Sequence, residues 1–167
     1  MQREKAVTED DWQFRSFLKG CRDKVIDRAV SELYREAIQA IDCRKCGQCC
    51  RELLPILTSA DIEKFATGMG QEPERFTSEY LTWDPEAEGY VWRKKPCPFL
   101  KHNQCSHYPF RPVDCAGYPH LDVPLVSSRL TMIIENLEIC PRIAYVWKRL
   151  KEHEAFGDWR REVEEYW

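Results

Sequence analysis

Four cysteines fall within ten residues in the segment IDCRKCGQCC, Ile41 to Cys50, and the last two are adjacent. Cα atoms joined by a trans peptide lie about 3.8 Å apart, whereas a relaxed disulfide needs about 4.4–6.8 Å, so Cys49 and Cys50 should not bridge each other. Successive side chains also tend to diverge. We therefore expect these two thiols to reach different metal ions, or different irons of one cluster, rather than one tetrahedral ion.

The redox state of the thiols depends on the cellular compartment. The N-terminal segment MQREKAVTEDDWQFR lacks the apolar core of a signal peptide, and no run in the sequence is long and apolar enough to span a bilayer. We therefore predict a cytoplasmic protein without a membrane segment. Thiols stay reduced there, and nine cysteines is an odd number, so a disulfide framework is not expected. The remaining explanations for so many cysteines are metal binding and a reactive thiol.

Composition fits one domain with its own core, because the chain has 167 residues, of which 43% are hydrophobic. The formal net charge of -3 and the pI of about 5.9 do not favour nucleic-acid binding. One basic, aromatic run, YVWRKK, could contact phosphates and stack on bases. It is a small electrostatic footprint in an acidic chain, so nucleic acid is not an expected partner.

Apolar residues recur at helical spacing near the N-terminus, which predicts one helix from about Glu9 to Ile41 with Cys21 on it as a small core residue. The predicted segments are an N-terminal packing helix (1–40), a cysteine-cluster domain (41–141) and a C-terminal helix on the same core (142–167). Together they make one domain. The last segment repeats apolar positions at Trp159, Val163 and Trp167, as helix packing does.

The middle of the chain predicts a short helix with its cap at Thr58 or Ser59 and a glycine stop at Gly68 or Gly70. A second short helix follows in EPERFTSEYL, and LTWDPEAEGYVWRKK predicts a β-hairpin with a tryptophan in each arm. The segment from Cys97 to His120 is rich in proline and predicts irregular loop. The expected fold class is small α+β, mainly helical, with irregular metal-knitted cysteine loops and a minor β-hairpin.

The cysteines form two blocks with characteristic spacing. The first reads Cys43-x2-Cys46-x2-Cys49-Cys50, and the second contains four cysteines at wider intervals: Cys97, Cys105, Cys115 and Cys140. Cysteines that only fill a core do not cluster at such intervals in glycine-containing loops. The spacing therefore indicates metal binding. Cys140 precedes Pro141, which suits the first position of a helix.

The motifs CRKCGQCC, PCPFL, CSHYPFRPVDCAGYP and ICP resemble the YkgJ-type family of cysteine-cluster proteins, described as zinc- or iron-chelating domains. The resemblance covers about Cys43 to Pro141. It implies that eight cysteines form the chelating set and that Cys21 lies outside it: Cys43, Cys46, Cys49, Cys50, Cys97, Cys105, Cys115 and Cys140. The cysteine blocks also resemble part of the flagellin lysine methylases. The chain has no glycine-rich nucleotide loop for a methyl donor, so that activity is not carried over.

Thiolates select zinc and iron-sulfur clusters alike, so the metal is inferred from spacing. Zinc sites with four cysteines usually have two x2 pairs, and only the first block contains such pairs. The run Cys43-x2-Cys46-x2-Cys49, with remote Cys-Pro steps at Cys97 and Cys140, is similar to the bacterial ferredoxin pattern. We favour an iron-sulfur cluster, [4Fe-4S] in type, with zinc as the other candidate.

Clustered thiolates are anionic and need cations or hydrogen-bond donors nearby. Basic residues crowd the cysteine loops: Arg44, Lys45, Arg51, Arg93, Lys94, Lys95, Lys101 and Arg111. Arg111 is the best candidate for a buried, oriented partner because its planar fork serves several acceptors. Gly47 should let backbone N–H groups approach sulfur closely. His107 and His120 are candidate substitute ligands or donors, whereas Arg93 to Lys95 should form a solvated edge.

A thiol enzyme is the competing hypothesis, with Cys50 as a nucleophile activated by His107 or His120. No orienting carboxylate or oxyanion-forming turn is recognisable, and such catalysis does not require eight thiols. The sequence therefore favours a metal-binding protein that acts as a redox or metal-handling accessory, with metal ions and an unidentified protein or redox partner. The alternative is a structural-zinc interaction module without catalytic activity.

Overall fold

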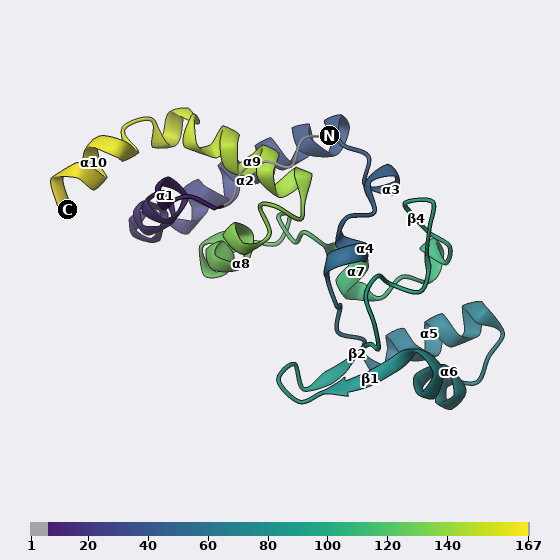
Figure 1. Cartoon of the computed structure of the whole chain (residues 1–167). Coiled ribbons are helices and arrows are strands. Elements are labelled where there is room, and N and C mark those ends of the chain that lie inside the picture. Colours follow the sequence, from purple (N-terminus) through teal and green to yellow (C-terminus); the bar gives the residue numbers. More distant parts are fainter. Residues whose placement is uncertain (1–6, 167) are drawn as a thin grey trace. The chain divides into compact units, whose positions relative to one another are not determined.

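The computed structural model describes residues 7–166. Residues 1–6 and Trp167, which is predicted to continue the apolar face of the last helix, lie outside that range. Between residues 7 and 166 the chain forms ten α-helices and two small antiparallel strand pairs (Figure 1). The predicted fold class, mainly helical with minor hairpins, is confirmed. None of the described helices combines the length and apolarity that crossing a bilayer requires.

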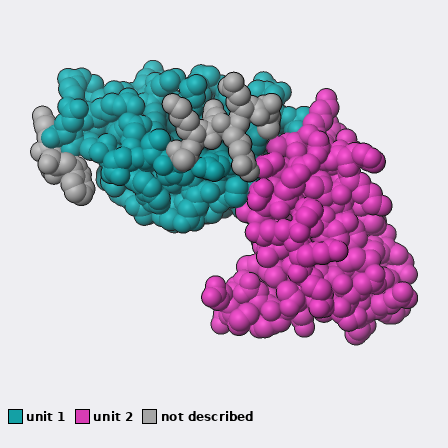
Figure 2. All heavy atoms as spheres, in the orientation of Figure 1, with its two compact units in different colours: residues 1–42, 119–167 teal, residues 43–118 magenta. Residues whose placement is uncertain are grey.

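The chain is organised as two compact units, coloured separately in Figure 2. Unit 1 consists of residues 1–42 and 119–167, and unit 2 is the continuous segment 43–118. The sequence predicts a single domain with a cysteine-rich part at 41–141. The compact unit that contains the first seven of the eight predicted ligands ends earlier, at Tyr118, and Cys140 belongs to the other unit.

Unit 1 is helical. Its elements are α1 (Glu9–Gly20), α2 (Asp23–Ala40), the 3-10 helix η2 (Val126–Arg129), α8 (Leu130–Glu135), α9 (Pro141–Lys151), the 3-10 helix η3 (Glu154–Phe156) and α10 (Trp159–Tyr166). α2 packs on α9, and α1 contacts α8 and α10, so segments from both ends of the sequence share one core. α9 begins with Pro141 as predicted, and it buries one face made of Ile143, Val146, Trp147 and Leu150.

The prediction of one helix from Glu9 to Ile41 is wrong, because the chain breaks between α1 and α2. Cys21 and Arg22 both have extended backbone dihedrals, and Gly20, a poor helix former, precedes them. The break has a packing consequence, since α1 and α2 contact different helices. Cys21 therefore lies in the connection rather than on a helix, and it is half-buried rather than a core residue.

Unit 1 contains a buried carboxylate, that of Asp11 in α1. Its Oδ1 accepts hydrogen bonds from Trp147 Nε1 at 2.8 Å and Lys151 Nζ at 2.7 Å. Its Oδ2 accepts from the Thr8 N–H and the Thr8 hydroxyl, each at 2.8 Å. Burial raises the pKa of Asp11, but the hydrogen bonds from Lys151, Thr8 and Trp147 outweigh it and lower the pKa to about 2.

Unit 1 should consequently lose stability in acid. The folded-state pKa of Asp11 lies below its unfolded value, so its contribution is complete above about pH 4 and disappears as the pH falls towards 2. The shift corresponds to about 2 kcal/mol. Hydrogen exchange of the α1 and α9 amides between pH 6 and pH 2 measures this loss. Asp11→Asn should be less stable at pH 6 and should show a weaker pH dependence; an unchanged dependence would assign the acid effect to other groups.

Unit 2 is built from short elements. They are α3 (Cys43–Cys46), α4 (Cys49–Glu52), α5 (Ser59–Met69), α6 (Pro73–Tyr80), β1 (Leu81–Asp84), β2 (Gly89–Trp92), β3 (Leu100–Lys101), β4 (Gln104–Cys105), the 3-10 helix η1 (Tyr108–Phe110) and α7 (Val113–Gly117). α5 begins after Thr58, whose hydroxyl accepts from the Asp61 N–H, and ends at Gly70 in the left-handed conformation. The predicted β-hairpin is confirmed, with Leu81 opposite Trp92 and Trp83 opposite Tyr90.

An aromatic cluster forms the core of unit 2 between α5, α6 and the β1–β2 hairpin. The Phe65 ring is 1% exposed, and its centroid lies 4.6 Å from that of Phe99, 5.3 Å from Phe76 and 5.5 Å from Trp92. Phe99 lies between Cys97 and Cys105 in the sequence. Cys97 and Cys105 pack against this core.

Candidate metal centre

Four segments of unit 2 bring five cysteines into one region. Cys49 and Cys50 start α4, Cys97 lies in the segment before β3, Cys105 ends β4 and Cys115 lies on α7. The Cys97 N–H donates to the Cys50 carbonyl at 2.8 Å, which joins the two cysteine blocks through the backbone. Electrostatic interactions connect the five thiols with one another. We call them the inner thiols.

The short helix α7, which carries Cys115, is fixed by two carboxylates. Asp61 Oδ1 accepts from the Val113 N–H at 2.9 Å, and Asp61 is 3% exposed. Asp114 Oδ2 accepts from the Ile56 N–H at 3.1 Å, which ties α7 to the segment after α4. A five-residue helix is too short to be stable alone. These bonds therefore position Cys115 relative to α4 and α5.

Burial and mutual repulsion keep most inner thiols protonated. Burial raises the pKa of Cys97 to about 11, and the neighbouring Cys105 and Cys49 add to the rise. Burial raises the pKa of Cys115 to about 12, and the charges of Cys97, Cys49 and Cys105 raise it further. Deprotonating any one of these thiols alone is energetically unfavourable. Deprotonating them together becomes favourable only when a bound cation neutralises their charge.

The side chains of the adjacent Cys49 and Cys50 share a hydrogen bond. That bond raises the pKa of Cys49, together with burial and the Cys50 charge. The same bond lowers the pKa of Cys50, against burial and the charges of Cys97 and Cys115. Both residues are in a helical turn, where side chains lean towards the same end, so their sulfurs can approach. Whether they serve different metal atoms stays a prediction.

Arg111 lies beside Cys105 but is half-buried, less than predicted. Its guanidinium stacks on Tyr108, 3.5 Å from the ring centroid, and its Nε donates to the Tyr108 carbonyl at 3.1 Å. Burial raises the pKa of Cys105, whereas the His107 N–H and the Arg111 charge oppose the rise. Arg111 thus stabilises a thiolate at Cys105 through its charge.

The two candidate histidines differ in position. The His107 ring packs against Phe65 and Phe99, with centroids 5.4 and 5.1 Å apart, and its Nδ1 lies 3.0 Å from the Ser106 hydroxyl. Its backbone N–H, not its ring, is hydrogen-bonded to the Cys105 sulfur. His120 belongs to unit 1. Cys50 belongs to unit 2, and its activation by His107 or His120 stays a hypothesis.

Cys43 and Cys46 form a pair at the two ends of α3, and Cys43 is exposed. α3 contacts β4, which places this pair beside the strand that ends in Cys105 (Figure 1). Gly47 follows with φ of +63°, in the left-handed region that favours glycine. A Cβ at position 47 would lie 2.9 Å from the Asn103 carbonyl oxygen, whereas the predicted approach of N–H groups to sulfur at Gly47 stays a prediction.

Cys140 is 6% exposed in unit 1, where it immediately precedes α9. Arg142, in the first turn of α9, donates two hydrogen bonds to the Ile41 carbonyl, at 3.0 and 2.7 Å. Ile41 follows the end of α2, and Cys43 comes two residues later in the sequence. The start of α9 is therefore hydrogen-bonded to the segment that immediately precedes the first cysteine block.

The donor set has the chemistry that thiophilic metals need. The inner thiols supply soft sulfur ligands, which zinc and iron-sulfur centres prefer. Within residues 7–166, no three cysteine, histidine, aspartate or glutamate side chains converge closely enough to hold an ion. Metal binding would require the inner thiols to deprotonate.

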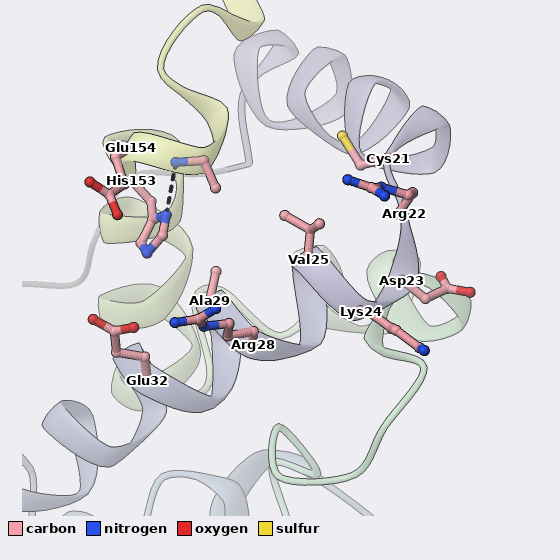
Figure 3. Close-up of a pocket in the computed structure, with 11 residues that line it drawn as sticks. Cys21, Arg22, Asp23, Lys24, Val25, Arg28, Ala29, Glu32, His153 and Glu154 are labelled. Carbon is pink, nitrogen blue, oxygen red and sulfur yellow. Dashed lines mark hydrogen bonds between the residues drawn. The ribbon is translucent and has the colours of Figure 1, made fainter.

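A cavity of about 820 Å³ lies in unit 1 (Figure 3). Cys21 and His153 both line it, and His153 Nδ1 accepts from the Ala155 N–H at 3.1 Å. The Cys21 thiol donates to the Phe17 carbonyl at 3.6 Å, and burial, with the Glu162 charge, raises its pKa. Cys21 is thus neither activated nor among the inner thiols.

The basic, aromatic run is largely structural. Trp92 is 2% exposed in the core of unit 2, so it is not available to stack on a base. Arg93, predicted to lie on a solvated edge, donates from Nη2 to the carbonyls of Ser78 and Leu81, both at 2.7 Å. These bonds satisfy acceptors at the C-terminal end of α6. Arg93, Lys94 and Lys95 are all exposed, and Arg93 is in addition held by these two bonds.

The chain was compared with known proteins in three ways, and one comparison identifies its family. Searches of the curated proteins and of the solved structures found no match. A family model does match, over residues 42–141; it is the CxxCxxCC family, described as "Putative zinc- or iron-chelating domain". The matched region contains the inner thiols, the Cys43–Cys46 pair and Cys140. The chain belongs to the CxxCxxCC family of zinc- or iron-chelating domains.

Proposed function

We propose that this chain is a cytosolic metal-binding protein that holds an iron-sulfur cluster of the [4Fe-4S] type through its cysteines and acts as a redox or metal-handling accessory. The observation that carries the proposal is the grouping of five inner thiols from four segments. One tetrahedral ion takes four ligands. Five interacting thiols, with Cys43, Cys46 and Cys140 in addition, therefore favour a centre with more than one metal atom.

The protein's own groups suit an anionic sulfur centre. Backbone N–H groups of Phe99 and Leu100 are hydrogen-bonded to the Cys97 sulfur, and that of His107 is bonded to the Cys105 sulfur. Arg111 adds a positive charge near Cys105. Such donors and charges tune the potential of a bound cluster, which would supply one-electron chemistry.

The test is a count of metal and sulfide per chain in protein purified without oxygen. Wild type should contain iron and acid-labile sulfide. Cys49→Ser and Cys50→Ser should each lose part of the metal, because serine is a poor ligand for soft metals, whereas Cys21→Ser, the matched control, should lose none. Full retention by either cysteine variant would remove that residue from the ligand set.

The same preparation distinguishes a redox centre from a structural one. A reversible change in visible absorbance on reduction with dithionite would support electron transfer. Colourless protein with two zinc ions and no sulfide would overturn the iron-sulfur proposal. It would identify the alternative instead, a structural-zinc interaction module without catalytic activity.

A further inference from the structure

Arg51 joins two segments of unit 2 that are far apart in the sequence. Its Nη1 donates to the Cys46 carbonyl at 3.2 Å, and its Nη2 donates to the side-chain oxygen of Asn103. Cys46 ends α3, and Asn103 lies in the turn between β3 and β4. We call this pair of bonds the Arg51 bridge. It connects the Cys43–Cys46 pair to the hairpin that carries Cys105.

The backbone around the Arg51 bridge allows only a small residue at position 47. A Cβ on Gly47 would lie 2.9 Å from the Asn103 carbonyl oxygen, 3.0 Å from its Cα and 3.1 Å from Arg51 Nη1. The turn between β3 and β4, which faces Gly47, also has an unusual backbone conformation, because His102 and Asn103 have φ of 50° and 65°. Two central residues with positive φ characterise the tight type I′ hairpin turn, where asparagine is favoured.

The contacts of the Arg51 bridge involve a carbonyl, an amide and a guanidinium, and no sulfur. They can therefore exist before any metal binds. α3 has four residues and buries none of them, so it has neither the length nor the core contacts to stay ordered alone. The position of the Cys43–Cys46 pair must depend on bonds made from outside the helix.

We propose that Arg51, Asn103 and Gly47 are positioning residues that hold the Cys43–Cys46 pair beside β4 and so fix the geometry in which this pair meets a metal. The metal-loaded part of the inference rests on the proposed function. The metal-free part does not, because it concerns the order of α3 itself.

The metal-free test uses trypsin, which cleaves after Arg44 and Lys45 inside α3. Arg51→Met removes the guanidinium, Arg51→Lys keeps the charge but not the planar fork, and Asn103→Gly removes the amide while allowing positive φ. Each should speed cleavage at these two positions about tenfold, the effect of losing a hydrogen bond to a charged group. His102→Gly, in the same turn, is the matched control and should cleave like wild type.

Gly47→Ala gives an independent test with its own control. Gly70 has nearly the same φ, 66°, but no atom lies within 4 Å of the position of its Cβ. Gly70→Ala therefore suffers only the backbone strain, and far from α3. Gly47→Ala should speed cleavage after Arg44 and Lys45 at least as much as Arg51→Met, and Gly70→Ala should leave it unchanged.

The metal-loaded test follows transfer of zinc from the full-length protein to a colorimetric chelator. Loss of groups that orient metal ligands typically weakens metal binding about 10–100-fold, so the Arg51 and Asn103 variants should release their weakest zinc correspondingly faster. Absorbance of the cobalt-loaded proteins should show fewer thiolate ligands in the same variants.

The outcomes separate the two proposals. Wild-type behaviour of Arg51→Lys in both tests would mean that Arg51 acts through charge alone, and it would overturn the Arg51 bridge. Unchanged cleavage in Arg51→Met and Asn103→Gly would do the same. A wild-type protein that takes up neither iron nor zinc would overturn the proposed function, while the metal-free cleavage would still decide whether the Arg51 bridge positions α3.

Discussion

Replacing Phe65 with alanine should lower the stability of unit 2 by about 3–5 kcal/mol. The ring is buried at the centre of the aromatic cluster and contacts Phe76, Trp92, Phe99 and His107, with centroids 4.6–5.5 Å away. Alanine would leave a cavity that rigid rings cannot refill. Since a whole domain is stabilised by only about 5–15 kcal/mol, much of unit 2 should open. Hydrogen exchange of the α5 amides measures the effect.

Trp83→Ala is the matched control for Phe65→Ala. Trp83 is equally aromatic and belongs to the same unit, but it is 55% exposed and stacks edge-on against Tyr90 on the β1–β2 hairpin. Exposed substitutions typically change stability by less than about 0.5 kcal/mol. Similar losses in the two variants would show that the aromatic cluster is not the main source of stability in unit 2.

Removal of metal should speed tryptic cleavage after Lys101 by about tenfold or more, equivalent to about 1.4 kcal/mol in local opening. Between Cys97 and Tyr118 the longest element is α7, and the β3–β4 pair contains only two residue pairs. So little hydrogen-bonded structure cannot offset the entropy of ordering the segment. If the cysteines close on a metal, they supply the missing constraint.

Cleavage inside α2 of unit 1 serves as the internal control for metal removal. Arg28 lies on this 18-residue helix, which packs on α9 without any inner thiol. A chelator should leave cleavage there unchanged. Equal resistance at Lys101 with and without metal would mean that the site is an accessory and not a determinant of the fold.

The elements that the sequence predicts correctly are those with local causes. The cap at Thr58, the left-handed Gly70, the start of α9 at Pro141 and the β1–β2 hairpin all depend on a few neighbouring residues. These features would be visible in short fragments of the chain.

The features that were missed depend on residues distant in the sequence. Asp61 has a local signal as a capping residue, but its bond to the Val113 N–H, 52 positions away, has none. The same holds for Asp11 and Lys151, and for Arg51 and Asn103. The sequence pattern does not predict the break at Cys21, because apolar spacing continues across it, whereas the extended backbone of Cys21 and Arg22 shows it.

The discontinuity of unit 1 has a consequence for synthesis on the ribosome. Residues 43–118 emerge as one complete unit, whereas residues 1–42 must wait for residues 119–167. During that interval the apolar face of α2 has no α9 to cover it, so chaperones would meet the nascent chain there. Early folding of the inserted unit would also replace a long flexible loop by a compact one, which lowers the entropic cost of joining the two halves. Among the eight family cysteines Cys140 is the last to be translated, so any ligation that needs it comes only as the closing helix arrives.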